Sequence, residues 1–244
     1  MVHAIEAPKL QTTSFDLEEL NQRMASAHPR EILAWCINNI PTGLVQSTAF
    51  GVTGMVIMDI LYRDLKPNPP IPVLFLDTLH HFHETLEFVE KAKATYNLDL
   101  RTYKTPEAND RHEFAKRYGV ALWHSNIEQF HHVTKVEPLQ RGLNELNTIA
   151  WITGRRRDQS ETRAELPIFE LDKQNRIKVN PLAHWTRKET WAYMMEFDVI
   201  YHPLLNQGYT SIGDEPLTTP VLPGEHERAG RWRGSQKTEC GIHI

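Results

Sequence analysis

Gly43-Leu44-Val45-Gln46-Ser47-Thr48-Ala49-Phe50-Gly51-Val52-Thr53-Gly54 is the stretch on which the predicted fold depends. Residues 43–49 have the apolar character of a buried strand, and residues 52–65 have the length and spacing of a helix. Short apolar strands alternate with amphipathic helices further along the chain, which is typical of a parallel sheet with right-handed crossovers. The sequence therefore predicts an α/β fold.

Downstream of this unit the pattern continues to residue 200. Strands are expected at residues 72–77, 98–103 and 148–153, and a hairpin at 168–171 and 176–179. Helices are expected at residues 82–97, 106–118, 135–146 and 186–197. We therefore expect residues 43–200 to form one α/β domain.

Two segments flank this domain. Residues 1–42 predict a helical lead-in, with helices at 16–27 and 29–39. Cys36 lies on an apolar helix face, where a thiol behaves as an inert core residue. Residues 201–244 are rich in proline and glycine and predict an irregular, mobile tail, which is typical of a lid or a binding segment.

The composition of the 244 residues excludes several classes of protein. Hydrophobic residues make up 40% and charged residues 24%, as in soluble globular proteins. The net charge of -4 gives no basic field for nucleic acid, and no apolar run is long enough to span a membrane. The first residues lack the pattern of a secretory signal, so a cytoplasmic protein is expected. Two widely separated cysteines make no disulfide framework or CxxC metal site, so free thiols are expected.

Ligands in an open α/β sheet bind beyond the carboxyl ends of the strands. After the first strand, Ser47, Thr48 and Gly51 run into a helix start, where backbone N–H groups and the helix dipole favour a phosphate. The same hydroxyls are also ordinary helix N-caps, so both interpretations stay open. The loop is neither a Walker A sequence nor GxGxxG, which excludes ordinary P-loop and Rossmann assignments.

The second strand ends in Asp77 and Thr78, which either hold a ribose or an adenine edge or cap the next helix. Three histidines follow within residues 80–83, but the second histidine of an HExxH zinc site is missing. We therefore expect no metal site here.

Basic residues gather in two places in a chain that is acidic overall. Arg155, Arg156 and Arg157 follow the fourth strand, where we expect their repulsion to go uncompensated unless an anion binds. The second group is Arg228, Arg231, Arg233 and Lys237. Scattered surface charge is the alternative. The two groups together predict an anionic nucleotide at the strand ends, covered by a basic tail.

That tail carries Cys240 within Lys237-Thr238-Glu239-Cys240-Gly241-Ile242-His243. Lys237 and His243 could supply positive charge that lowers the pKa of the thiol, and the thiolate is the nucleophilic form. The alternative is a frayed tail with an incidental cysteine.

These motifs resemble those of phosphoadenylyl-sulfate (PAPS) reductases, most closely the fungal, thioredoxin-dependent type. They run in the order of that family from about residue 43 onward, and their joint occurrence is more specific than any one of them. The similar segments are Ser47-Thr48-Ala49-Phe50-Gly51, Leu76-Asp77-Thr78, Lys135-Val136-Glu137-Pro138, Gly154-Arg155-Arg156, Gly208-Tyr209-Thr210-Ser211-Ile212-Gly213-Asp214, Gly230-Arg231-Trp232 and Glu239-Cys240-Gly241-Ile242-His243.

The resemblance implies an adenine-nucleotide hydrolase-like fold with a modified pyrophosphate loop, and a homodimer. It implies reduction of PAPS to sulfite and adenosine 3',5'-bisphosphate in assimilatory sulfate reduction, with thioredoxin or glutaredoxin as electron donor. The Cys240 thiolate would attack the sulfur, and reduced thioredoxin would release sulfite from the S-sulfonated enzyme. The mobile tail would close over the nucleotide bound by the 43–200 domain.

The resemblance also implies the site residues. Arg231, Lys237 and His243 would stabilise charge around Cys240, and Lys135 would join the three arginines in binding phosphate. The substrate-binding candidates are Ser47, Thr48, Ala49, Phe50, Gly51, Leu76, Asp77, Thr78, Lys135, Gly154, Arg155, Arg156, Arg157, Gln159 and Tyr209.

A neighbouring branch, the adenylyl-sulfate (APS) reductases, holds a four-iron cluster with a Cys-Cys pair and a CxxC pair. The matched positions here are Phe130 and His131 for the first pair, and Asp214 and Leu217 for the second. Without thiolates such a cluster does not form. The resemblance therefore implies PAPS rather than APS as substrate, and no cofactor besides reduced thioredoxin as co-substrate.

Two other functions remain open. An adenylyl-transferring ATP pyrophosphatase would share the fold, but residues 47–51 lack the glycine pair and the aspartate of the SGGxDS loop that such enzymes usually carry. A non-catalytic nucleotide-binding module would bind PAPS without turnover, and Cys240 would be incidental.

Overall fold

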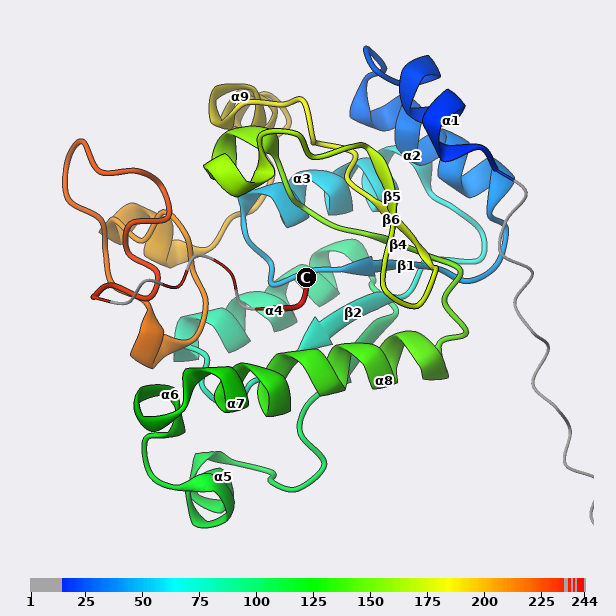
Figure 1. Ribbon diagram of the computed structural model, residues 1–244. Coiled ribbons are helices and arrows are strands. Elements are labelled where there is room, and N and C mark those ends of the chain that lie inside the picture. The colour runs from blue at the N-terminus through cyan, green and yellow to red at the C-terminus, as the bar shows by residue number, and fades with distance from the viewer. Residues whose placement is uncertain (1–14, 235–236, 238, 240, 244) are drawn as a thin grey trace, which may run out of the picture.

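The computed structural model describes residues 15–234, 237, 239 and 241–243. Within these residues one sheet has the strand order β3-β2-β1-β4-β6-β5, in which only β5 and β6 pair antiparallel (Figure 1). The strands are β1 (Leu44–Ser47), β2 (Val73–Leu76), β3 (Leu100–Tyr103), β4 (Ala150–Ile152), β5 (Phe169–Leu171) and β6 (Ile177–Val179). The predicted α/β fold and the predicted hairpin are confirmed.

The described helices follow the predicted order, with two additions. Short helices α6 and α7 lie between the predicted helices at 106–118 and 135–146, and two π-helical segments, Ile60–Leu65 and His132–Val136, continue α3 and precede α8. The helices are α1 (Leu17–Arg23), α2 (Pro29–Asn39), α3 (Val52–Asp59), α4 (His83–Tyr96), α5 (Arg111–Tyr118), α6 (Leu122–Ser125), α7 (Ile127–His131), α8 (Glu137–Glu145) and α9 (Arg187–Glu196). None of them is long and apolar enough to cross a membrane.

Helices cover both faces of the sheet. The larger core, with Leu44 of β1 and residues of α3, α4 and α9, lies on one face, and a smaller core formed by Val45, Leu139 and Leu143 lies under α8 on the other. Leu44 and Val45 point to opposite faces because side chains alternate along a strand. From β1 the strand order continues through β2 and β3 on one side and through β4, β6 and β5 on the other. The strand order therefore reverses between the carboxyl ends of β1 and β4, which is where ligands bind in such sheets.

The N-terminal helices belong to the same larger core. Leu20 of α1 and Cys36 of α2 are buried in it, which confirms Cys36 as a core residue. Asn21 of α1 also closes the outer edge of β5: its amide donates to Phe169 O over 2.8 Å and accepts from Phe169 N over 2.9 Å. The backbone N–H and C=O of Phe169 on this edge strand are therefore satisfied by a side chain.

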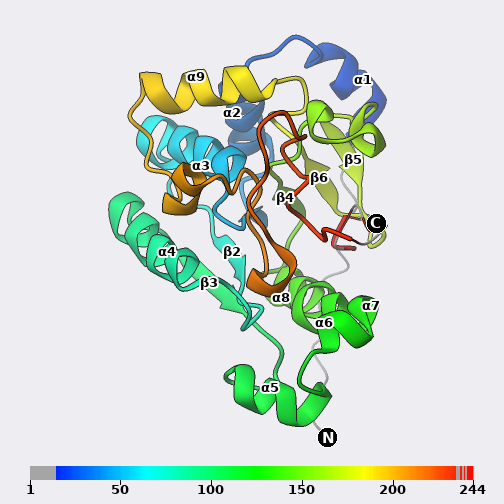
Figure 2. The same ribbon diagram turned by 90° about the vertical axis from the view of Figure 1, so that its left-hand side faces the viewer.

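The chain after residue 201 crosses the carboxyl ends of the strands (Figure 2). Its described residues form two 3-10 turns (Pro203–Gln207 and Glu215–Leu217) and one isolated bridge, and the rest of their backbone is irregular. This segment is nevertheless packed, because Leu204, Asp214 and Trp232 are all buried. Irregular backbone here forms a wall of the site described below.

Candidate active site

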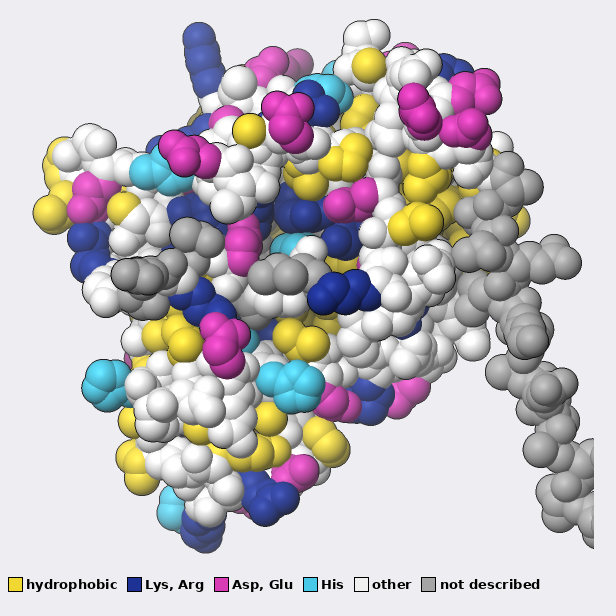
Figure 3. Space-filling model, in the orientation of Figure 1, with side chains coloured by type: hydrophobic (Ala, Val, Ile, Leu, Met, Phe, Trp, Pro, Cys, Tyr) yellow, Lys and Arg dark blue, Asp and Glu magenta, His cyan; other side chains and the backbone are white. Residues whose placement is uncertain are grey.

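A cavity of about 250 Å³ lies at the carboxyl ends of β1 and β4. The loops after these two strands line one side, and residues from 205 to 243 line the other. On this face of the molecule Lys and Arg side chains gather around a hollow, with Asp and Glu among them (Figure 3). The strand-end rule thus located the cavity from sequence.

The loop after β1 leaves the amino end of α3 open to the cavity. Thr48 Oγ1 accepts a hydrogen bond of 2.9 Å from Phe50 N, and Phe50 takes a positive φ of 55°. Its ring is fully buried and meets Phe75 edge to face, so Phe50 anchors the loop from below and does not line the cavity. Gly51 is the N-cap of α3, and no side chain bonds there. The N-cap interpretation of the Ser47 and Thr48 hydroxyls is therefore wrong, and the first helical N–H groups can meet an anion.

Two glycines let the loop after β4 approach α3. A Cβ on Gly154 would lie 2.6 Å from Thr53 Oγ1 and 3.2 Å from Gly54 N, and a Cβ on Gly54 would lie 2.2 Å from Thr48 Oγ1. Both distances to the hydroxyls are shorter than real contacts of a Cβ. Only glycine permits the two strand-end loops to pack this closely.

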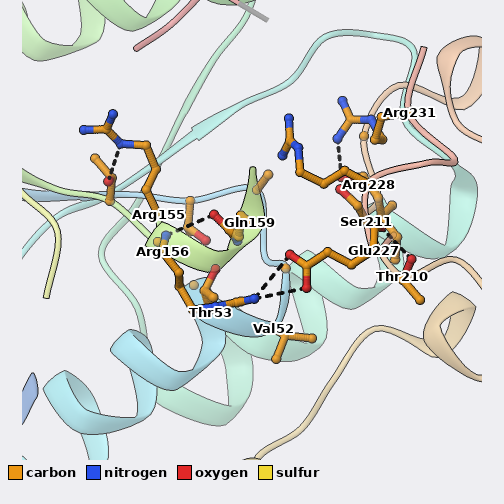
Figure 4. Close-up of a pocket in the computed structure, with 18 of the residues that line it drawn as sticks. Val52, Thr53, Arg155, Arg156, Gln159, Thr210, Ser211, Glu227, Arg228 and Arg231 are labelled. Atoms are coloured by element: carbon orange, nitrogen blue, oxygen red, sulfur yellow. Dashed lines mark hydrogen bonds and ion pairs between the residues drawn. The ribbon is translucent and has the colours of Figure 1, made fainter. Parts of the chain in front are cut away.

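The three consecutive arginines have internal partners, contrary to the expectation that their repulsion is uncompensated. Arg155 pairs with Glu170, and Arg156 pairs with Asp158 over 2.9 Å. Arg156 also pairs with Glu227 over 3.0 Å (Figure 4). Arg157 turns away from the cavity, where it donates to Leu166 O over 2.9 Å and bonds His184 Nδ1 over 3.0 Å. Only the first two arginines line the cavity.

Cations nevertheless outnumber carboxylates around the cavity. Seven Lys and Arg side chains line it, against three carboxylates from Asp214, Glu227 and Glu239. The seven are Lys135, Arg155, Arg156, Arg163, Arg187, Arg228 and Arg231. The site is therefore electropositive within an acidic chain and suited to a polyanionic ligand.

Lys135 reaches the cavity from the π-helical segment before α8 and forms a buried ion pair with Asp214. Burial alone raises the pKa of Asp214, but the charges of Lys135 and Arg231 outweigh burial and hold that pKa well below its usual range. Asp214 is therefore ionised, and the ion pair fixes Lys135 at the wall of the cavity.

The residues around Cys240 dock onto the body of the molecule, whereas Cys240 itself lies outside the described residues. Glu239 forms an ion pair of 2.7 Å with Arg163 and one of 3.5 Å with Arg228. Ile242 packs against the smaller core, and the His243 ring stacks on Trp151 with centroids 5.8 Å apart. Residues that precede Cys240 and residues that follow it in the sequence therefore both line the cavity.

His243 does not supply positive charge in this structure, contrary to the sequence-based expectation. Its Nδ1 is inaccessible to solvent, although part of the residue is exposed. Burial, and then the charges of Arg155 and Arg163, lower the pKa of His243 well below its ordinary value. The imidazole is neutral near pH 7, so any charge that stabilises a thiolate comes from other residues.

Most of the predicted site residues meet at the cavity. Those that line it are Ser47, Thr48, Ala49, Gly51, Leu76, Thr78, Lys135, Gly154, Arg155, Arg156, Gln159, Arg231 and His243. Asp77 instead accepts from Leu79 N over 2.9 Å and shapes its own turn, and Tyr209 packs edge to face on Phe82 with centroids 5.4 Å apart. Lys237 pairs with Glu128 of α7. With Phe50 and Arg157, these three are not among the lining residues.

Several lining residues escaped prediction. Arg163 lies in a short 3-10 turn and Glu227 in an irregular segment, both outside the quoted motifs, and Thr53 lies within the predicted helix at residues 52–65. His81 also lines the cavity, stacked on Phe75, and burial lowers its pKa. Of these residues, only Arg163 had a usable signal in the sequence, its positive charge, because the other predicted residues of the site include several cations.

The four positions matched to cluster ligands do come together in space. Phe130 and Leu217 share one apolar cluster, and His131 Nε2 lies 4.0 Å from Asp214 Oδ2. Trp232 Nε1 lies 3.4 Å from His131 Nε2. Two of these side chains are apolar, and the other two are engaged with each other, with Trp232 and with Lys135. This set does not fit an iron–sulfur cluster, which thiolates hold.

Comparison with known proteins gives consistent matches. The family model of the phosphoadenosine phosphosulfate reductase domain matches residues 43–220. A phosphoadenosine phosphosulfate reductase from Emericella nidulans is 44% identical over 97% of this chain and 78% of its own length. An adenosine 5'-phosphosulfate reductase from Staphylococcus haemolyticus is 39% identical over 88% of this chain and 86% of its own. A crystal structure of PAPS reductase from Candida auris, in a phosphate complex, has a TM-score of 0.76 at 38% identity and covers 86% of this chain and 98% of that one.

Proposed function

Because this chain belongs to the phosphoadenosine phosphosulfate reductase family, we propose that it reduces PAPS to sulfite and adenosine 3',5'-bisphosphate through Cys240. The electron donor in this proposal is reduced thioredoxin or glutaredoxin, and the enzyme is a cytoplasmic homodimer without a resident metal or cofactor. Family membership removes the support for an ATP-using adenylyl transferase or a non-catalytic module.

One observation supports this proposal above the others. Glu239 and His243, which lie on either side of Cys240 in the sequence, line the same cavity as the amino end of α3. The cavity offers helix N–H groups and an excess of cations to a phosphosulfate. In this proposal Cys240 is the nucleophile, and its sequence neighbours Glu239 and His243 line the cavity that would bind the phosphosulfate.

In the proposed first step the Cys240 thiolate attacks the sulfur of the phosphosulfate. A sulfur–sulfur bond forms, the bond between sulfur and the bridging oxygen breaks, and the bisphosphate nucleotide leaves with the electron pair. A thiolate of reduced thioredoxin then attacks Cys240 Sγ, and sulfite leaves with the electrons of the sulfur–sulfur bond. The second thioredoxin thiol resolves the mixed disulfide and restores Cys240, so thioredoxin ends as the disulfide.

The described cations could stabilise the negative charges of this step, which are the thiolate and the phosphates of the nucleotide. Arg163 and Arg228 lie beside Glu239, where their charge favours an anionic thiolate in the next residue. Arg156 and the amino end of α3 would bind the phosphates, and Arg231 lines the cavity opposite them (Figure 4). Neutral His243 serves as a hydrogen-bonding group rather than as a charge.

PAPS is the proposed nucleotide because the cluster positions carry Phe130, His131, Asp214 and Leu217 instead of cysteines. The bacterial APS reductase is nearly as similar to this chain as the fungal PAPS reductase, so overall identity does not separate the two substrates. The excess of cations favours the nucleotide with the additional phosphate.

Intact-mass measurement tests the covalent step. The protein is incubated with PAPS in the absence of reductant, and its mass is expected to increase by one sulfonate group, which reduced thioredoxin then removes. Cys240→Ser should show no increase. Cys36→Ser is the matched control and should behave as wild type, because Cys36 is buried in the core. A sulfonated Cys240→Ser protein would show that Cys240 is not the nucleophile.

A further inference from the structure

Asn180 directly follows β6 and is completely buried. It does not line the cavity, but β6 pairs with β4, and the residues after β4 do line it. Asn180 can therefore affect a ligand only through a neighbouring side chain. No family motif quoted above includes it.

The carboxamide of Asn180 makes four hydrogen bonds. Its Oδ1 accepts from Thr153 Oγ1 over 2.6 Å and from Arg155 Nε over 3.2 Å. Its Nδ2 donates to Pro167 O over 2.9 Å and to Glu170 Oε1 over 3.1 Å. A carboxamide has two acceptor sites and two donors, so its capacity is filled. The orientation is also determined, because a flipped amide would place its donors against the Arg155 N–H.

The backbone of Asn180 is fixed as well. Its N–H donates to Ile168 O over 2.7 Å, and its carbonyl accepts from Ala183 N over 3.0 Å. A side chain on this backbone has little freedom to move, so its four bonds define a rigid reference point beside the carboxyl end of β4. Hydrogen bonds from a rigid neighbour of this kind hold a ligand-binding side chain in its productive geometry.

Arg155 is the group that needs such support. Burial, and then the repulsion of Arg163, lower the pKa of Arg155 to about 10, so it stays charged near neutral pH at an electrostatic cost. Its Nε bonds Asn180, and its Nη2 bonds Glu170, which Asn180 holds in turn. Nη1 has no hydrogen-bond partner within the described part of the chain, and Arg155 lines the cavity. The bonds to Asn180 and Glu170 thus orient the Arg155 guanidinium and leave the N–H donors of Nη1 for a ligand.

We propose that Asn180 is a positioning residue that orients the Arg155 guanidinium for binding of the anionic nucleotide by bridging Thr153, Arg155 and Glu170. This inference rests on the proposed function, because it takes the cavity to be the nucleotide site. It adds a residue that does not touch the ligand and acts on it chiefly through Arg155.

A double-mutant cycle tests this inference. The affinity for adenosine 3',5'-bisphosphate is measured by calorimetry for wild type, Asn180→Leu, Arg155→Met and the double variant. Each single variant is expected to bind about tenfold more weakly or worse, because a charge-assisted bond or its alignment is lost. The double variant is expected to bind no more weakly than Arg155→Met alone. A merely structural role of Asn180 would not produce this non-additivity.

Two further variants keep the test decisive. Asn21→Leu is the matched control, since Asn21 also bridges strand backbone at β5 but lies on α1 away from the cavity, and it should keep wild-type affinity. If Asn180→Leu does not fold, Asn180→Ala decides, because it removes the same four carboxamide bonds with a smaller side chain and should lower affinity only while Arg155 is present. Wild-type affinity in the folded variant, or an equal loss in the Arg155→Met background, would overturn the inference. A wild-type protein without affinity for the nucleotide would instead refute the proposed function itself.

Discussion

His202 shows how one buried side chain determines a pH dependence. It is 1% exposed, its Nδ1 accepts from Leu204 N over 3.2 Å, and its Nε2 therefore carries the proton and meets Thr85 Oγ1 over 2.9 Å. Burial lowers the pKa of His202 to about 4. The unfolded chain, with an ordinary histidine, takes up more protons between that value and about pH 6.5, so folding stability decreases as the pH falls through this window.

We expect the free energy of unfolding of wild type to lose about 1 to 2 kcal/mol more than that of His202→Asn between pH 7 and pH 5. Urea titrations at both pH values measure this difference. His112→Asn is the matched control, because it makes the same substitution at an exposed histidine outside the core. Identical pH dependences for wild type and His202→Asn would contradict this interpretation of the buried imidazole.

The sequence predicted which residues lie at the strand ends, but it did not predict the direction in which their side chains point. Ser47, Thr48 and Arg156 line the cavity, as the strand-end rule predicts. Phe50 and Arg157 lie in the same loops but point elsewhere, because Phe50 has a positive φ and Arg157 finds Leu166 O. A motif match gives the position of a residue along the chain and leaves its orientation undefined.

At the scale of elements, the close approach of the β4 loop to α3 gives a second prediction. Gly154→Ala places a Cβ 2.6 Å from Thr53 Oγ1, so the loop must move off the amino end of α3. We expect a loss of about 1 to 3 kcal/mol in stability and weaker binding of inorganic phosphate, measured by thermal unfolding and titration. Thr53→Ala should partly rescue Gly154→Ala, since it removes the nearest atom.

Gly51→Ala is the matched control for stability. Gly51 has φ of -73° and nothing within 4 Å of an added Cβ, so alanine fits there without strain. An equally stable Gly154→Ala would show that the two loops can separate freely, and the account of the glycine contact would be wrong.

Element order was predictable because hydrophobic periodicity and turn residues mark each strand and helix of ordinary length. Four- and five-residue helices such as α6 and α7 have too few residues for a period to show. The hairpin was predicted, but the parallel pairing of β6 with β4 was not, because strand neighbours depend on the whole sheet. That pairing is what places Asn180 beside the residues after β4.

At the scale of the whole molecule, the C-terminal residues are tied to the body through separate anchors. Glu239 pairs with Arg163, Ile242 packs on the smaller core, and Lys178 Nζ donates to His243 O over 3.3 Å. The sequence predicted a covering tail from its basic residues. It did not show this docking, because the partners come from β4, β6 and a 3-10 turn that are distant in the chain.

We expect Ile242→Ser to lower kcat for sulfite release about tenfold or more, with little change in thermal stability, because the segment that carries Cys240 loses its apolar anchor. Leu222→Ser is the control, since Leu222 lies in the same C-terminal segment but is 64% exposed, and it should keep wild-type kcat. Equal kcat values for wild type and Ile242→Ser would show that this anchor plays no part in the reaction.

We propose that this chain reduces PAPS without an iron–sulfur cluster and uses Cys240 as its nucleophile. The most direct measurement is the rate of sulfite release from PAPS and from APS in parallel, each with reduced thioredoxin, for wild type and Cys240→Ser. We expect rapid release from PAPS by wild type, much slower release from APS, and none from either nucleotide by Cys240→Ser. Faster release from APS than from PAPS, or wild-type release by Cys240→Ser, would contradict it.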